Sequence, residues 1–243
     1  MSQSDKALLA LRQLILNGEL AAGERFSELS IVDRLGGFSR TPVKLALVRL
    51  AEEGLVEEAS GGGYIVSSFD EADIRDAIEL RGTVEGLAAR KAAERRLDRQ
   101  ALAGLRDTVG ALDAVVRRRE IGEHDFLDYI RLNQGFHDSI LTLADSRVLR
   151  RAFERIVVLP FASPSAFVID QSNIPEAREV FVIAQAHHRT LLEALSAGEG
   201  ARAEAIAREH ARLALKNLQY ALASSDRISE VPGSALIRLR EAG

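Results

Sequence analysis

The sequence predicts a mostly α-helical protein in two parts: a short region of three helices and a β-hairpin, followed by a longer and entirely helical region. Two observations carry this prediction. Apolar residues recur at helical spacing along most of the 243 residues. Only the stretch 55–66 changes to short apolar runs around glycines, as in a hairpin. We place the first region at residues 1–69, the second at 70–225 and a C-terminal tail at 226–243.

The composition limits the class of protein. Apolar residues make up 47% of the chain and charged residues 28%, which is ordinary for a globular protein. The net charge of −4 means that any DNA binding must rest on a local positive surface. Cysteine is absent, which excludes disulfides and thiolate sites and agrees with the cytoplasmic location that we expect. Neither a signal peptide nor a membrane-spanning run is expected.

Each helix of the first region has a recognisable boundary. The first helix ends near Gly18, and the stretch AAGERF after it is expected to be a loop. Ser27 is a favoured N-cap residue, so a short second helix begins there. The third helix starts around Thr41–Pro42, because proline is favoured in the first turn of a helix, and Gly54 stops it.

A hairpin follows the three helices. Leu55–Val56 and Tyr64–Val66 are expected to be two short strands around a glycine turn at 61–63. Three short helices and a hairpin in this order describe a winged helix-turn-helix, in which the third helix enters the major groove of DNA. The first region is therefore expected to be a DNA-binding module.

The third helix carries a basic surface. With its valine and leucine residues buried, Arg40 and Lys44 project from the opposite face one turn apart, and Arg49 lies further round, where it suits a phosphate. The segment has no carboxylate before Glu52. A solvated helix face is the alternative reading of these charges, and the order of the elements favours DNA binding.

The second region is helical from Asp70 to about residue 225. The expected helices start at polar caps, prolines and glycines; their starts lie at Asp70, Asp98, about Asp125, Ser146, about Pro175 and about Gly200. The first of them is expected to carry Leu87 on its apolar face, and Pro160 is expected to end the fourth.

Three of the five histidines lie on apolar faces of the expected helices. His137 shares a face with Asn133, which is four residues earlier on the same helix. His188 and His210 each align with apolar residues of the last two helices. The three imidazoles are therefore expected to point toward the core of a helical bundle.

A single metal ion would explain all three histidines at once. A buried polar ring without a partner costs about 1–3 kcal/mol, whereas neutral imidazole is a good metal ligand. We expect a divalent ion, zinc in the first place with nickel or manganese as alternatives, and Asn133 as a fourth ligand through its amide oxygen. Separately hydrogen-bonded core histidines are the other reading. His187 is a rival of His188, and His124 is expected to be solvated.

Two sets of segments carry a resemblance to a known family. The segment LRQLILNGELAAGERFSELSIVDRLGGFSRTPVKLALVRLAEEGLV resembles the winged helix-turn-helix of GntR-family transcription regulators. The segments ELRGTVEGLAARKAA, NQGFHDSILTLADSRVL and HHRTLLEALSAGEGARAEAIAREHARLAL resemble the FCD ligand-binding domain of the FadR subfamily. Together they span almost the whole chain except the tail. The resemblance implies an antiparallel bundle of six or seven helices in the second region.

The resemblance also implies a site in that bundle. The metal ligands of the family fall on Asn133, His137, His188 and His210, with asparagine in place of the usual aspartate. Family members bind small carboxylates in the same cavity, where Arg81 matches a recurring arginine. A salt bridge of Arg81 to Glu85, four residues later, is the alternative role for this arginine.

The implied function is an effector-responsive transcription regulator, with repressor as the expected sign, that binds palindromic operator DNA as a homodimer. Arg40, Thr41 and Lys44 are expected at base edges. The residues expected at phosphates are Arg25, Ser39 and Arg49. Lys44 and Leu45 stand where the family commonly has Arg-Glu, which implies a different operator or weaker binding. We expect no enzymatic activity. Two alternatives stay open: a metal-dependent hydrolase, and a regulator whose histidine pocket binds its ligand without metal.

Overall fold

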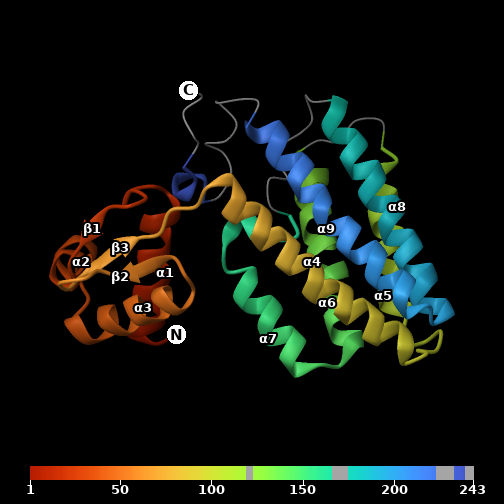
Figure 1. Ribbon diagram of the computed structural model, residues 1–243, viewed down its shortest axis with the longest axis horizontal. Helices are drawn as coiled ribbons and strands as arrows, with labels where there is room; N and C mark the ends of the chain where they lie inside the picture. The colour runs from red at the N-terminus through yellow and green to blue at the C-terminus, as the bar shows by residue number, and fades with distance from the viewer. Residues whose placement is uncertain (119–122, 166–174, 223–232, 239–243) are drawn as a thin grey trace. The chain divides into compact units, whose positions relative to one another are not determined.

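The computed structural model describes residues 1–118, 123–165, 175–222 and 233–238 of the chain (Figure 1). The chain divides into two compact units, each with a hydrophobic core of its own. As far as they are described, the first unit is built from residues 1–74, 158–161 and 229–243, and the second from residues 75–157 and 162–228.

The first unit contains three helices and a small antiparallel sheet. Its elements are, in order, α1 (Gln3–Leu16), β1 (Arg25–Phe26), α2 (Glu28–Leu35), α3 (Arg40–Glu52), β2 (Val56–Glu58) and β3 (Tyr64–Val66). The strands are ordered β1-β3-β2, with Phe26 opposite Tyr64 and Val56 opposite Val66. This arrangement confirms the winged helix-turn-helix predicted for the first region.

One strand of this sheet is a correction to the sequence prediction. The stretch AAGERF, for which a loop is expected, contributes β1, and its Arg25–Phe26 pairs with β3. Two residues are too few for an alternating pattern to be visible in the sequence. Helix α2 begins as predicted, because the Ser27 hydroxyl accepts a hydrogen bond from the backbone N–H of Ser30 at 3.1 Å.

The core of the first unit decides which face of α3 is presented outward. Helix α1 packs against α3, and Leu11 and Ile15 of α1 and Leu47 and Leu50 of α3 are all fully buried. Burying one such side chain stabilises the fold by about 1.5–3 kcal/mol relative to leaving it exposed. The opposite face of α3 therefore lies at the surface of the unit.

A C-terminal segment also belongs to this unit. The short 3₁₀ helix η2 (Ser234–Leu236) places Leu236 in the core, where it is fully buried. The backbone of Phe69 donates to the carbonyl of Leu236 at 2.9 Å and accepts from the N–H of Arg238 at 2.8 Å. The rest of the predicted tail lies outside the described residues.

The second unit contains the long helices. They are α4 (Glu71–Glu94), whose first residues lie in the first unit, α5 (Ala103–Val116), α6 (Glu123–Ala144), α7 (Arg147–Ile156), α8 (Pro175–Ala197) and α9 (Gly200–Leu222); a 3₁₀ turn, η1 (Pro160–Ala162), follows α7. Six α-helices in the described residues agree with the predicted bundle. Helix α8 packs against α9 and α5, and α5 also packs against α6 (Figure 1).

Three details of these helices differ from expectation. Asp98 does not begin α5, because its carboxylate accepts from the N–H of Ala101 at 2.8 Å in a separate turn and the helix starts at Ala103. Helix α7 ends at Ile156, before Pro160 is reached. Leu87 of α4 is exposed rather than buried.

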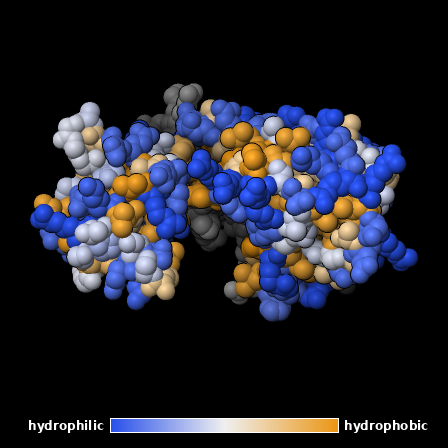
Figure 2. Space-filling model, turned by 90° about the horizontal axis from the view of Figure 1, so that it is seen from below, coloured by the Kyte–Doolittle hydropathy of each residue, from blue (hydrophilic) through white to orange (hydrophobic). Residues whose placement is uncertain are grey.

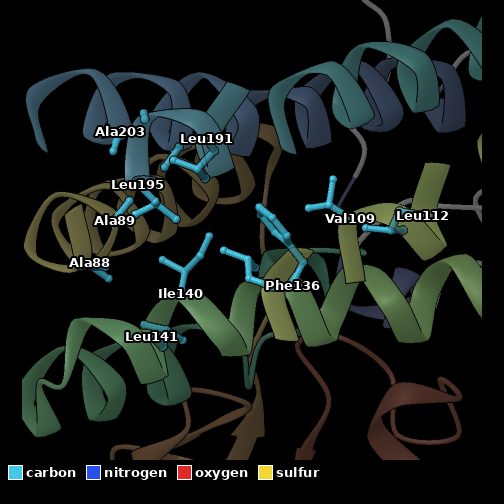
Figure 3. Packing of buried hydrophobic residues seen from close by; sticks show 14 of the residues in the cluster. Ala88, Ala89, Val109, Leu112, Phe136, Ile140, Leu141, Leu191, Leu195 and Ala203 are labelled. Atoms are coloured by element: carbon cyan, nitrogen blue, oxygen red, sulfur yellow. The ribbon is translucent and has the colours of Figure 1, made fainter. Parts of the chain in front are cut away.

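The core of the second unit is a continuous apolar cluster. It draws alanines from α4 and larger side chains from α5, α6 and α8. Figure 3 shows Phe136 and Ile140 of α6 pointing toward Leu191 and Leu195 of α8. This packing fixes the rotation of α6 and α8, and with it the direction of the polar side chains one turn away on the same faces.

The polarity of the surface is consistent with the burial of most hydrophobic side chains in the two cores. The face drawn in Figure 2 is largely hydrophilic, and its hydrophobic residues form separate small patches. Among the described helices, none combines the length and the apolar character that crossing a membrane requires.

Candidate metal centre and nucleic-acid interface

Three histidines from three helices converge inside the second unit. His137 comes from α6, His188 from α8 and His210 from α9, and their exposed fractions are 3%, 0% and 8%. One ring nitrogen from each lies within 4.8 Å of the others. The structure thus brings together the three imidazoles that the sequence singled out, in the geometry of a possible metal centre.

Hydrogen bonds determine which nitrogen of His188 carries its proton. Its Nδ1 lies 3.0 Å from Oε1 of Gln185, whose own amide group donates to the Val109 carbonyl at 3.0 Å and to the Asp113 carboxylate. Because an amide oxygen only accepts, Nδ1 of His188 carries the proton and donates it. The lone pair of Nε2 therefore faces the cluster.

His210 is held in the complementary state. Its Nε2 lies 3.2 Å from Nε2 of His188, so the proton between them belongs to His210. Its Nδ1 is buried and has no hydrogen-bond partner. Coordination through Nε2 would require His210 to move its proton to Nδ1, whereas His188 needs no such change.

His137 is oriented by a buried carboxylate. Its Nδ1 lies 2.6 Å from Oε1 of Glu85, and its Nε2 is buried without a partner. Glu85 is also 3.9 Å from the Nε of Arg81 through its other oxygen. A carboxylate on the far nitrogen of a histidine is the arrangement that commonly orients metal-ligating imidazoles.

Burial sets the charge states in this cluster. It lowers the pKa of His188 and of His210 well below the ordinary value, and neighbouring histidines lower both further. Both rings are therefore neutral near pH 7, as metal coordination requires. Burial by itself raises the pKa of Glu85, but His137 and Arg81 together hold it below the ordinary value, so Glu85 is ionised.

The residues present fit a metal ion. Nε2 of His137 and Oδ1 of Asn133 are buried atoms without partners, and a divalent cation would satisfy both. Asn133 is 3% exposed, and its amide nitrogen donates to the Pro164 carbonyl and the Ser165 hydroxyl, both at 3.3 Å. These bonds leave the amide oxygen as the atom that is free to act as a ligand.

The other two histidines lie outside this centre. His187 is only half-buried, and burial is the main cause of its lowered pKa. It contributes no atom to the cluster found among the described residues. The side chain of His124 is 90% exposed and lies 3.6 Å from Asp128. The geometry thus shows that His188, and not His187, belongs to the cluster, a choice that the periodicity of the sequence leaves open.

A small cavity adjoins the histidines. Its volume is about 30 Å³, and its lining includes Arg81, Asn133, His210 and Asn217. The Oδ1 of Asn217 and the Nε of Arg81 are buried without hydrogen-bond partners. Arg81 is 2% exposed and donates to the Ala211 carbonyl at 3.1 Å. The cavity therefore presents a buried cation and unpaired polar atoms to anything that enters.

Three residues of this site are not predicted from the sequence in the role that they have in the structure. From the sequence, Glu85 is expected only as a partner of Arg81, and neither Gln185 nor Asn217 is expected in the site. Each of the three is buried on a helix. A polar residue at an apolar position of a helix was the signal available for Gln185 and Asn217, as it was for the histidines.

The second candidate site is the outward face of α3 in the first unit. Arg40, Thr41 and Lys44 are exposed there, at the N-terminal half of the helix. The first turn of α3 contains no acidic residue, and the Ser39 side chain makes no capping hydrogen bond. A helix N-terminus with free donors and nearby cations attracts phosphate groups.

Two of the predicted phosphate contacts already have intramolecular partners. Arg25 donates to the carbonyls of Ser60 at 3.2 Å and Gly62 at 2.9 Å, at the tip of the wing. Arg49 lies 3.3 Å from the Asp5 carboxylate, and both side chains are about half exposed. The exposed Arg49–Asp5 ion pair is weak, so it does not prevent Arg49 from meeting DNA.

Comparison with known protein families gives two matches. The sequence profile described as bacterial regulatory proteins, gntR family, matches residues 3–66. The profile of the FCD domain matches residues 76–213. The two matched segments correspond to the winged helix-turn-helix and to the helical unit.

Individual proteins are similar over most of the chain. An uncharacterized HTH-type transcriptional regulator in an unstable DNA locus of Streptomyces ambofaciens is 30% identical over 228 residues, covering 89% of this chain and 85% of the relative. A protein of Paenarthrobacter nicotinovorans named "Probable D-xylose utilization operon transcriptional repressor" is 30% identical over 197 residues, covering 78% of this chain and 77% of the relative. The solved structure of E. coli McbR/YncC has a TM-score of 0.60 at 20% identity, covering 92% of this chain and 100% of that one, which shows a shared fold.

Proposed function

Because the chain belongs to the bacterial gntR family of regulatory proteins and carries an FCD domain, we propose that it represses transcription from a palindromic operator as a homodimer. We also propose that a small carboxylate, bound beside a metal ion in the helical unit, controls its affinity for DNA. The family and its relatives identify the protein as a DNA-binding transcription regulator and not an enzyme.

The DNA-binding half of the proposal assigns roles on and around α3. Arg40, Thr41 and Lys44 approach base edges from the exposed N-terminal half of the helix. Arg25, Ser39 and Arg49 contact phosphates, which fixes the position of the head on the duplex without reading sequence. A two-fold dimer presents two such heads, and this is why we propose a palindromic operator.

The sensing half rests on the helical unit. His137, His188 and His210 would hold the metal ion, with Asn133 as a neutral oxygen ligand. A bound divalent ion would supply an electrophilic contact for a carboxylate oxygen. Arg81 offers the second contact, because its buried guanidinium lines the adjoining cavity.

The size of the cavity supports a coupling between ligand and DNA. About 30 Å³ has room for one or two water molecules but not for an organic acid. A carboxylate effector therefore requires that the residues lining the cavity move apart. An effector changes DNA affinity when it prefers one arrangement of the helices, and only by the difference in its affinity for the two arrangements.

The observation that carries this proposal is the convergence of three buried imidazoles from α6, α8 and α9. The test is metal binding by the purified chain, measured by competition with a chromophoric zinc chelator. His188→Ala should lose most of the zinc affinity, and the matched control His187→Ala should keep it. If both variants bind zinc as the parent does, the proposed centre is wrong.

A regulator that binds its ligand without metal is the second candidate. It is favoured by the hydrogen bond between His188 and His210, which satisfies two ring nitrogens without an ion. Fluorescence anisotropy with an operator fragment separates the two, using a panel of organic acids with zinc and with a chelator. Release of DNA by an acid in the presence of the chelator would favour the metal-free pocket.

A further inference from the structure

Helix α3 carries apolar side chains on both of its faces. Its buried face is formed by Val43, Leu47 and Leu50, as a helix packed on a core requires. On the opposite face Leu45 is 50% exposed and Val48 is 38% exposed. The core does not use these two residues, which we call the apolar strip.

The apolar strip lies within the basic part of the helix. Lys44 precedes Leu45, and Thr41 lies four residues before Leu45, so the three share the outward side of the first two turns. Arg40 begins the helix, and no carboxylate occurs before Glu52. A surface that is apolar at its centre and cationic at its border matches the floor of a DNA groove between two rows of phosphates.

We propose that the apolar strip reads thymine methyl groups in the major groove, so that Leu45 and Val48 determine part of the operator sequence. The C5-methyl of thymine is the apolar feature by which major-groove edges of base pairs differ. A leucine side chain has no hydrogen-bonding group and so gains nothing at guanine, adenine or cytosine edges. This inference rests on the proposed DNA-binding function of α3.

The neighbouring Lys44 strengthens the case for apolar reading. An ammonium group donates to guanine O6 and N7 as arginine does, but it lacks the rigid planar fork that fixes the geometry of an arginine contact. Lys44 therefore constrains the base that it meets less strictly than an arginine would. Discrimination at this part of the site is shared with Thr41 and the apolar strip.

The experiment starts from operators selected by the full-length protein from a random duplex library. Each thymine of the selected half-site is then replaced by uracil, which removes only the methyl group, and affinity is measured by fluorescence anisotropy. We expect at least one position at which uracil weakens binding about fourfold, the effect of withdrawing one methyl from an apolar contact. At that position Leu45→Ala should bind thymine and uracil equally.

Two further variants complete the test. Leu45→Met keeps an apolar side chain of similar volume and should remain sensitive to uracil. Leu9→Ala on α1 truncates a leucine that is 46% exposed and should leave the sensitivity unchanged. Binding of selected DNA with no sensitivity to uracil at any position would overturn the inference and leave the proposed function intact. Failure to select any DNA would overturn both.

Discussion

At the scale of single residues, two of the three histidines of the cluster are oriented for a ligand by a partner on Nδ1. The Oε1 of Gln185 accepts a hydrogen bond from Nδ1 of His188, and the Glu85 carboxylate lies 2.6 Å from Nδ1 of His137. Both rings then turn Nε2 toward the common centre. His210 lacks such a partner on its Nδ1, so it alone must exchange its proton position when a metal binds.

Glu85 is expected to control metal affinity although it is not a proposed ligand. Glu85→Gln preserves the shape of the side chain and a hydrogen-bond acceptor for His137, but it removes the negative charge. Loss of such an outer partner weakens metal binding by about 10–100-fold. Competition with a chromophoric chelator measures the loss.

The control for Glu85 lies on the same helix. Glu94 is an exposed residue of α4 that pairs with Arg90 at 2.8 Å, and Glu94→Gln should bind zinc as the parent does. Nitrogen-15 NMR of the metal-free protein provides a second readout. The amide of Glu85→Gln can accept a hydrogen bond from Nδ1 of His137 or donate one to it, so the His137 ring of this variant should populate both tautomers. Equal zinc affinities for the two variants would contradict the role given to Glu85.

The metal-free protein is expected to lose stability as the pH falls below about 6.5. The folded state keeps His188 and His210 neutral, because burial lowers the pKa of both rings. The unfolded state takes up protons at the ordinary histidine pKa, so it binds more protons than the folded state in this range. Stability therefore decreases with falling pH, by up to about 1.4 kcal/mol per pH unit for each histidine.

Urea unfolding with a chelator present, between about pH 7.5 and about pH 5.5, measures this slope. His188→Gln should reduce the slope whatever its effect on stability at neutral pH. His124→Gln should leave it unchanged, because the His124 side chain is 90% exposed. A parent protein whose stability is constant over this range would show that the two rings are not buried in neutral form.

At the scale of elements, the sequence predicts most helices because their ends carry local signals. Ser27 and Ser146 accept hydrogen bonds at the starts of α2 and α7, as their position predicts. The failures have local causes. β1 is too short to show a pattern, and Leu87 stays exposed because alanines, not leucines, form the fully buried face of this part of α4.

The site was only partly predictable for a different reason. Asn133 and His137 share one helix, so their common face follows from spacing alone. The bond between Glu85 and His137 joins α4 to α6, and no periodicity within one helix indicates which residue of another helix it meets. The same limit applies to Gln185, whose amide reaches α5 from α8.

Helix α4 is expected to resist enlargement at its glycines. A Cβ at Gly82 would lie 2.8 Å from Cβ of Ala211 on α9, closer than real Cβ contacts. Gly→Ala within a helix normally stabilises by about 0.5–1 kcal/mol, but here the overpacking should exceed that gain. We expect Gly82→Ala to destabilise the protein by about 1–3 kcal/mol in urea unfolding.

The control for this element is a glycine without neighbours. Gly110 lies inside α5, and a Cβ there would meet no atom within 4 Å. Gly110→Ala should therefore stabilise the protein by about 0.5–1 kcal/mol. If the two substitutions change stability in the same direction, the close approach of α4 and α9 is not rigid.

At the scale of the whole molecule, the compact units are not continuous stretches of the chain. The first unit contains residues 1–74 and also takes in 158–161 and part of the C-terminal segment. Leu159 and Leu236 pack on the same core as α1 and α3. The stability of the DNA-binding head therefore depends on residues far from it in the sequence.

Leu236 offers a test of how far the stability of the first unit depends on residues distant in the sequence. Its side chain is fully buried in the core of the first unit, and the backbone pairing between Phe69 and residues 236–238 holds it there. Leu236→Ala leaves a cavity, so we expect a loss of about 2–5 kcal/mol in the urea unfolding of this unit. Ser234→Ala, in the same 3₁₀ helix but only half-buried, should change stability by less than about 0.5 kcal/mol. Hydrogen exchange of the amides of α1 and α3 locates the effect: faster exchange there in Leu236→Ala places it in the head, whereas equal effects of the two variants would mean that this segment does not contribute to the core in solution.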